Sequence, residues 1–165
     1  MTAIDDKWAA NQWLGAPVDE GAGSDEGPLP DGRGRVRDFQ NGSIYWTPEH
    51  GAHIVLGAIR LKWAEKGGHR GILRYPVSDE VPCGPGDGRF NHFEGGSIYW
   101  RADIGPHMVH GPVRDKWASL GWQDGGLGYP LSDVRVSGDT QSGTFQHGTI
   151  VWTPSRGAVV AGNID

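Results

Sequence analysis

One stretch of sequence is written three times in this chain. Lys-Trp-Ala occurs at residues 7–9, 62–64 and 116–118, and Phe-x-x-Gly-(Ser/Thr)-Ile-x-Trp occurs at 39–46, 93–100 and 145–152. A repeat of this length is typical of one small structural unit copied in tandem, each copy burying its apolar side against its neighbours. The repeat therefore favours a multivalent binding or architectural protein over an enzyme with a single cleft.

The composition indicates a folded protein rich in turns. Gly and Pro contribute 28 and 11 of the 165 residues, which alone would suggest low complexity. Eight Trp, four Tyr and four Phe supply the large apolar groups that disordered chains lack. Gly and Pro therefore punctuate many short elements, as in a mostly β protein.

Charge, cysteine content and hydropathy narrow the class further. The net charge of −5 argues against a nucleic-acid partner, whose phosphates need a basic face. Cys83 is the single cysteine, so we expect no internal disulfide and a small apolar side chain rather than a reactive thiol. No apolar run is long enough for a membrane span, and the first residues lack the pattern of a signal peptide.

Each copy predicts a short helix and a β-hairpin. An apolar residue and a Trp lie four apart, and thus on one helix face, in the segments 4–8, 59–63 and 113–117. Connectors containing Pro follow at 14–18, 73–77 and 127–131 and predict short edge strands. A Gly-rich loop then leads to a hairpin that pairs residues 35–39 with 43–46, and the other two copies repeat it.

The ends of the chain suggest how the copies close. Gly162-Asn163-Ile164-Asp165 matches the lead-in to the helix at 59–63, and the same lead-in begins the chain at residues 2–5. We therefore predict one mainly β domain with short helices, in which copies of about 12–66, 67–120 and 121–165 plus 1–11 form a closed, propeller-like ring of pseudo-threefold symmetry. The N-terminal helix would complete the last copy, and closure would leave only short sheet edges. An open stack of three units is the alternative.

The second hairpin strand carries two different faces. Ile-x-Trp is identical in every copy, at 44/46, 98/100 and 150/152, which indicates core. The opposite face varies: it holds Ser43 and Tyr45, Ser97 and Tyr99, and then 149 and 151 as Thr and Val. A Tyr ring can stack on a sugar and its hydroxyl can bond one, although it could equally pack against a neighbouring loop.

The third copy lacks both this Tyr and the His found at equivalent places as His53 and His107. Joint loss suggests one shared ligand site in the first two copies, although drift would give the same pattern. The candidate ligand-binding residues are Tyr45, Tyr99, His53, His107, Ser43 and Ser97. Further candidates for polar contacts, or ordinary solvated residues, are His92, His147, Asp38 and Glu94.

Metal binding and catalysis find little support. His-x-x-His occurs at 50/53 and 107/110, but the partners flank the equivalent His on opposite sides, so we expect no metal site and no cofactor. Two interpretations of the acidic loops 19–31 and 84–87 stay open, namely calcium binding and plain turns. No Gly-x-Ser-x-Gly occurs, and Asp79 and Asp133 stand in equivalent copies rather than across one cleft. We expect no catalytic residues.

The ordered motifs resemble the LGFP repeat family over nearly the whole chain. Leu14-Gly15-Ala16-Pro17, Gly51-Ala52-His53 and Leu127-Gly128-Tyr129-Pro130 carry the likeness, although the Phe of the family name is Ala16, Tyr75 and Tyr129 here. The resemblance implies a secreted or cell-envelope module, as in actinobacteria, where such repeats accompany mycolyltransferases, esterases or peptidoglycan hydrolases and are thought to anchor them to wall polysaccharide. We expect no catalytic domain beside these repeats.

These observations predict a non-catalytic, multivalent, lectin-like module that binds cell-envelope polysaccharide through shallow sites at the junctions between copies or on the hairpin faces. The alternative is a structural or protein-interaction scaffold, with a tethered protein as its partner. An enzyme is the third class, and it would need an acidic pocket with inequivalent carboxylates.

Overall fold

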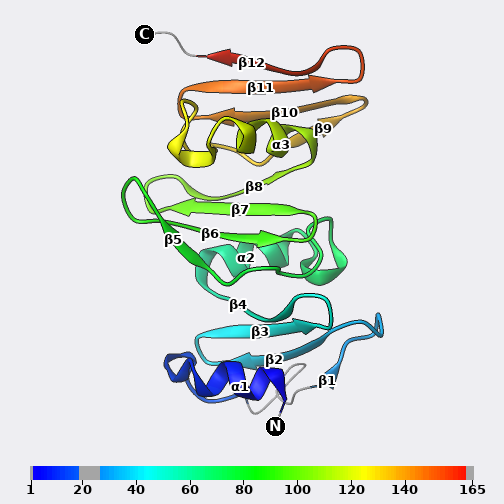
Figure 1. Cartoon of the computed structure of the whole chain (residues 1–165), viewed down its shortest axis with the longest axis vertical. Helices are drawn as coiled ribbons and strands as arrows, with labels where there is room; N and C mark the ends of the chain where they lie inside the picture. The colour runs from blue at the N-terminus through cyan, green and yellow to red at the C-terminus, as the bar shows by residue number, and fades with distance from the viewer. Residues whose placement is uncertain (1, 19–26, 163–165) are drawn as a thin grey trace. The chain divides into compact units, whose positions relative to one another are not determined.

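The chain divides into two compact units. The computed structural model describes residues 2–18 and 27–162. Unit 1 comprises residues 1–80 and 91–94, and unit 2 comprises residues 81–90 and 95–165. A helix, a single 3-10 turn and an antiparallel sheet follow one another three times (Figure 1). The prediction of a mainly β protein with short helices in three tandem repeats is confirmed.

The helices form where the Lys-Trp-Ala phrases predicted them. They are α1 (Ala3–Ala9), α2 (Gly57–Glu65) and α3 (Gly111–Ser119), each followed by a 3-10 turn: η1 (Gln12–Leu14), η2 (Gly68–Arg70) and η3 (Trp122–Asp124). Thr2 and Asp5 cap α1 reciprocally, each side chain accepting the other's backbone N–H. Gly67 and Gly121, with φ of 100° and 104°, reverse the chain after α2 and α3.

Each sheet has four antiparallel strands in sequence order. The first consists of β1 (Gly27–Pro28), β2 (Arg35–Phe39), β3 (Gly42–Thr47) and β4 (Gly51–Val55). The second consists of β5 (Val81–Cys83), β6 (Gly88–Phe93), β7 (Gly96–Arg101) and β8 (Gly105–His110). The third consists of β9 (Arg135–Ser137), β10 (Thr140–Phe145), β11 (Gly148–Thr153) and β12 (Gly157–Gly162).

The predicted hairpins and edge connectors are present. Phe39 pairs with Gly42 across a two-residue loop, and Phe145 pairs with Gly148 in the same way. The proline connectors run beside the hairpins and form single bridges, which are Pro17 to Phe39, Pro76 to Phe93 and Pro130 to Phe145. The connector therefore extends the sheet by one short edge, as its sequence predicts.

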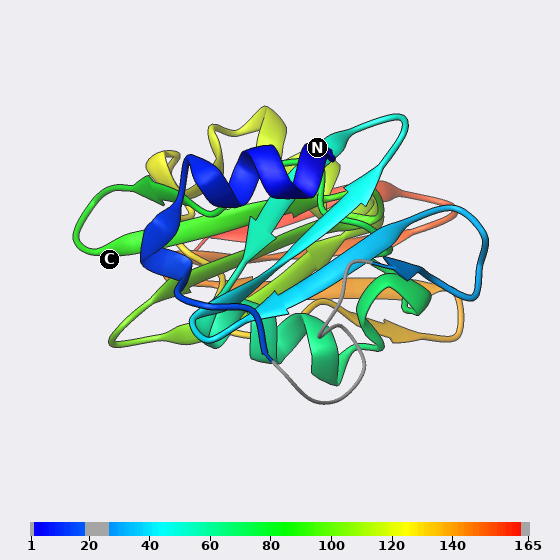
Figure 2. The same ribbon diagram turned by 90° about the horizontal axis from the view of Figure 1, so that it is seen from below.

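In unit 1, α1 covers one face of the first sheet. It packs against β3 and β4, as Figure 2 also shows. Ile4, Ile44 and Ile54 are buried together there with Leu14 and Phe39. The N-terminal helix therefore contributes to the core beneath the first sheet.

The other face of the hairpin strand is covered by the next helix along the chain. In unit 1, the Trp63 ring lies edge-on to Tyr45 of β3 at 4.7 Å and stacks on Phe93 at 5.5 Å. In unit 2, Trp117 makes the same pair of contacts, with Tyr99 of β7 at 4.7 Å and with Phe145 at 5.3 Å. Both faces of β3 and of β7 are thus packed.

The described residues form open antiparallel sheets, and no closed barrel or propeller is seen among them. Closure into a ring stays a prediction. The acidic loop at 19–26 and the match at 163–165 lie outside the described residues. No described helix is long and apolar enough to cross a membrane.

Candidate functional site

The Leu-x-x-Pro segment is the point at which helix, hairpin and neighbouring copy meet. Its Leu is buried in every copy. The carbonyl of the following residue accepts a hydrogen bond from the indole N–H of the helix Trp, at 2.9 Å from Trp8, 2.9 Å from Trp63 and 3.0 Å from Trp117. That following residue has positive φ in all copies, being Gly15, Arg74 and Gly128. A Gly suits the position because left-handed backbone is strained for other residues.

The third residue of the segment is fixed by the hairpin turn. The backbone N–H of Ala16, Tyr75 and Tyr129 donates to a side-chain oxygen of the turn residue, which is Gln40, Glu94 and Gln146 respectively, at 3.0 to 3.2 Å. The two Tyr side chains then reach a glycine of the preceding copy. A Cβ on Gly34 would overlap the Tyr75 ring, and a Cβ on Gly88 would overlap that of Tyr129.

We call these two places the first junction, around Tyr75 and Gly34 in unit 1, and the second junction, around Tyr129 and Gly88 in unit 2. The Tyr75 hydroxyl donates to Asp31 at 2.7 Å, and the Tyr129 hydroxyl donates to the Pro85 carbonyl at 3.2 Å. Both rings are buried, and burial is the first cause that raises the pKa of each phenol. In the second and third copies, the Tyr in the Phe position of LGFP therefore fills the space beside a Gly of the preceding copy, and we call this Tyr ring the plug.

Tyr45 and Tyr99, predicted to bind sugar, lie against the following helix. Tyr99 is 2% exposed, and its ring also stacks on Phe90 at 4.9 Å. Burial raises the pKa of the half-buried Tyr45 to about 12. The structure thus places both rings in packing contacts, the alternative weighed from the sequence.

Ser43 and Ser97 are fully buried beside these Tyr residues. The Ser43 hydroxyl donates to Asp38 at 2.5 Å, while that of Ser97 accepts from the Arg114 guanidinium at 2.9 Å. Both serines are 0% exposed. Their described partners are side chains of the protein itself.

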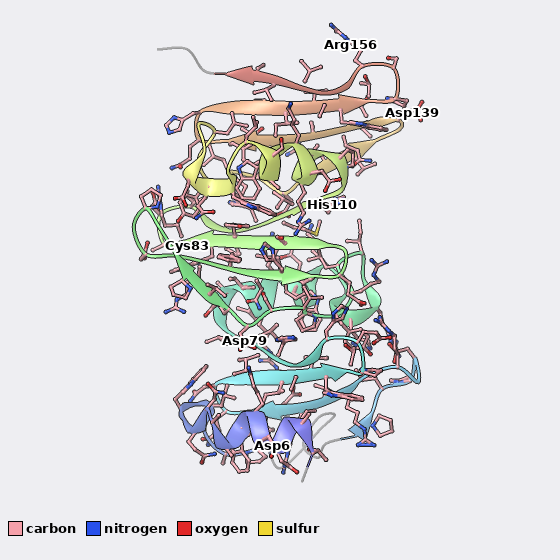
Figure 3. All side chains as sticks on the ribbon, in the orientation of Figure 1. Asp6, Asp79, Cys83, His110, Asp139 and Arg156 are labelled. Carbon is pink, nitrogen blue, oxygen red and sulfur yellow. The ribbon has the colours of Figure 1, made fainter. Side chains whose placement is uncertain are left out.

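His53 and His107 each bridge a turn and the Asp of the next copy. His53 contacts the His50 carbonyl at 2.7 Å and Asp79 at 3.3 Å. Asp79 lies beside β4 (Figure 3), where it also accepts the Ile54 N–H at 3.0 Å and pairs with Lys7 at 2.5 Å. Burial alone would raise the pKa of Asp79, but the hydrogen bonds from His53 and Lys7 outweigh it and lower this pKa to about 2.

The second copy repeats this arrangement with Asp133. This Asp accepts the Met108 N–H at 2.8 Å and lies 3.7 Å from the His107 ring. In the third copy the register pair that would hold Tyr and His is Val151 with Val159, and these are 37% and 44% exposed. In the first two copies, the Tyr and the His thus contact a helix and an Asp of the following copy.

An open hollow lies beside the second junction. Its volume is about 520 Å³, and it is lined by Gly84, Pro85, Gln123, Asp124, Gly125, Gly128, Gln146 and His147. Four of these side chains carry hydrogen-bonding groups, and no Lys or Arg is among them. Such a surface suits hydroxyl and amide groups, because carboxylate, amide and imidazole provide both donors and acceptors.

The sequence predicts one of these residues, His147, as a polar candidate, and it predicts shallow sites at the junctions between copies. Gln123, Asp124 and Gly128 were not predicted. The signal available for Gly128 was its place in the Leu-Gly-Tyr-Pro segment, where a Cβ would collide with the Gln146 side chain. His92 and Asp38 are not part of the hollow.

Glu94 is engaged inside the protein. Its carboxylate accepts two hydrogen bonds from Arg33, at 2.7 and 2.5 Å, and lies 3.2 Å from the His50 ring. The Arg33 hydrogen bonds are the first cause that lowers the pKa of Glu94 to about 2. No group of three His, Cys, Asp or Glu side chains in the described part of the chain is arranged to hold a metal ion.

The fold and the junctions define a tandem-repeat protein. At each described junction, a Tyr of one copy packs against a Gly of the preceding copy. The model of the LGFP repeat matches three times, at residues 14–71, 73–125 and 127–164. The chain therefore belongs to the LGFP repeat family, and the resemblance drawn from its motifs is confirmed. A comparison with curated proteins found no match.

Proposed function

We propose that this protein is a non-catalytic module that binds cell-envelope polysaccharide, with the hollow at the second junction as its binding site. The observation that carries the proposal is the lining of that hollow by Asp124, Gln123, Gln146 and His147 around three glycines. Glycine backbone permits close approach, and planar polar side chains can bond neighbouring hydroxyls of one sugar.

The lining also favours a neutral sugar over an acidic one. The single formal charge among the lining residues is that of Asp124, and the whole chain has a net charge of −5. A phosphate or uronate would meet a carboxylate there without a guanidinium or ammonium to balance it. Several weak sites on linked modules would gain strength by avidity on one polymer, by about 10²–10⁴ over single affinities.

The test is binding to isolated cell-envelope polysaccharide, by pull-down and on a glycan array. We expect Asp124→Ala combined with His147→Ala to weaken binding about tenfold or more, because each lost hydrogen bond contributes roughly 1 kcal/mol. Asp139→Ala with Arg156→Ala, both exposed in the same unit (Figure 3), is the matched control and should bind as the wild type does. Equal binding by both double variants would remove the hollow as the site.

A structural or protein-interaction scaffold is the second candidate. The observation in its favour is that Tyr45, Tyr99, His53 and His107 all contact residues of the following copy. A wild-type protein that binds no envelope glycan would support the scaffold and contradict the polysaccharide proposal.

We also propose that the copies close into a pseudo-threefold ring. Ala16 is the residue of the first copy that corresponds to Tyr75 and Tyr129, and Thr140 is the residue of the third copy that corresponds to Gly34 and Gly88. A small residue in the plug position and a side chain in the glycine position would suit each other in volume, which supports a third contact between copies.

A further inference from the structure

The two junctions are built from equivalent residues. Tyr75 corresponds to Tyr129, and each of their hydroxyls bonds a residue three positions before the glycine that its ring covers: Asp31 before Gly34, and Pro85 before Gly88. The turn residues Glu94 and Gln146 also correspond, since each accepts the backbone N–H of its Tyr. The surroundings of the two rings can therefore be compared position by position.

Each junction has a guanidinium over its Tyr ring, but the two guanidinium groups bind different carboxylates. At the second junction, Arg101 lies 4.8 Å from the centre of the Tyr129 ring and bonds Asp103. At the first junction, the cation binds the turn residue. The Arg33 guanidinium forms two parallel hydrogen bonds with Glu94 and lies 5.2 Å from the centre of the Tyr75 ring. Glu49 lies 3.4 Å from the same guanidinium. The residue that corresponds to Arg33 in the second junction is Asp87, and it is not among the residues that line the hollow.

Two further substitutions leave space at the second junction. Gln146 stands where the first junction has Glu94, so no carboxylate there demands a cation. Gly128 stands where the first junction has Arg74, which removes a side chain from the edge of the hollow. Arg74 has a φ of 59°, so the first junction keeps the same backbone shape with a side chain attached.

We propose that Arg33, held by Glu94, fills at the first junction the place that corresponds to the hollow at the second junction. The ligand class is that of the proposed function, a neutral sugar of an envelope glycan, and the inference on ligand binding rests on that function. The claim that Arg33 fills the first junction does not depend on that function. Arg33 thus determines how many of the two junctions can bind.

Opening the first junction requires two changes. Glu94 is 13% exposed at its side chain, so removing Arg33 alone would leave a nearly buried carboxylate without its main partner. Gln at position 94 would keep the acceptor for the Tyr75 N–H, as Gln146 does for Tyr129. The variant to make is therefore Arg33→Ala with Glu94→Gln.

The first readout is a crystal structure of this double variant, which needs no ligand. We expect a hollow beside Tyr75 that resembles the one at the second junction. If neighbouring side chains move in and fill the space, the proposed role of Arg33 is wrong.

The second readout is calorimetric titration with a soluble oligosaccharide released from the envelope polysaccharide. We expect the number of sites per chain to rise from one to two, while the charge-matched control Arg156→Ala with Glu65→Gln stays at one. The second site should be the weaker one, because Arg70 and Gly95 stand where the second junction has Asp124 and His147. An open hollow with an unchanged number of sites would overturn the role of Arg33 in binding. A wild type that binds no sugar would refute the proposed function, and the crystal structure alone would then decide whether Arg33 fills the first junction.

The reciprocal variant, Asp87→Arg with Gln146→Glu, guards against a first double variant that does not fold. We expect it to fill the second hollow and to abolish the remaining sugar site. Retention of full binding, with an arginine in place, would contradict the proposal.

Discussion

At the residue scale, the contact between successive copies depends on an absence. The Tyr75 and Tyr129 rings lie where a Cβ of Gly34 or Gly88 would be. Neither glycine is among those with positive φ, so the backbone itself would accept alanine. What excludes a side chain at these positions is the ring of the next copy, which is a packing constraint and not a conformational one.

We therefore expect Gly88→Ala to destabilise the protein by about 1–3 kcal/mol, the usual cost of overpacking. The cost should be smaller in a Tyr129→Phe background, because the phenol oxygen is the atom closest to the added methyl. Gly126→Ala, whose Cβ would meet nothing within 4 Å, is the control. Denaturant unfolding measures the stability of each variant. Equal stability of Gly88→Ala and Gly126→Ala would contradict the close contact between the Tyr129 ring and Gly88.

At the element scale, β4 is joined to the segment after the second Leu-x-x-Pro by one carboxylate. Asp79 accepts from His53, from the Ile54 N–H and from Lys7. Three elements that are distant in sequence thus share one anion. The hydrogen bonds hold the carboxylate ionised, which is why its pKa is about 2 rather than near 4.

This lowered pKa predicts a specific loss of stability in acid. Since the folded pKa lies below the unfolded one, the contribution is complete above about pH 4 and disappears as the pH falls toward 2. Asp79→Asn should cost about 1 kcal/mol at neutral pH, because the half-exposed pair is screened by water, and should flatten the stability curve between those pH values. Chemical denaturation from pH 2 to 7 tests this against Asp139→Asn, and parallel curves would refute it.

The elements themselves were largely predictable, and their surroundings were not. The spacing of Ile59 and Trp63 predicts α2, and the Phe-x-x-Gly turn predicts each hairpin, because both signals are local. Ile44, Ile98 and Ile150 are 0% exposed as expected, whereas the Trp two residues later is half-buried in every copy. Alternation separates the two faces of a strand, but it does not say what covers them. The cover on Tyr45 is Trp63, a residue of the next helix.

The candidate site was predictable only in outline. A hollow depends on how far side chains reach, and its presence at the second junction follows from Gly128 and Gln146 in place of Arg74 and Glu94. Such differences are single-residue changes within a repeat whose motifs are constant. His147 could be named from its position in a turn, while Asp124 could not, since nothing in the sequence relates η3 to that turn.

At the scale of the whole molecule, the proposed ring makes a prediction about distance. Dyes attached at Ala10 and Ala161, both exposed, in a Cys83→Ser background should show high energy transfer if the copies close. Urea should abolish that transfer at the concentration that unfolds the protein. Low transfer under native conditions would exclude closure.

The contact between a Tyr of one copy and a Gly of the preceding copy also affects how such an array can be lengthened by recombination. The middle copy carries both a Tyr at position 75 and a Gly at position 88, so a duplicate of it would fit on either side of itself. A duplicate of the last copy would bring Thr140 against a Tyr, and a duplicate of the first would bring Ala16 against a Gly, so one insertion is crowded and the other leaves a void. Copies that look interchangeable by motif are therefore positional, and growth by whole-repeat duplication is easiest from the middle.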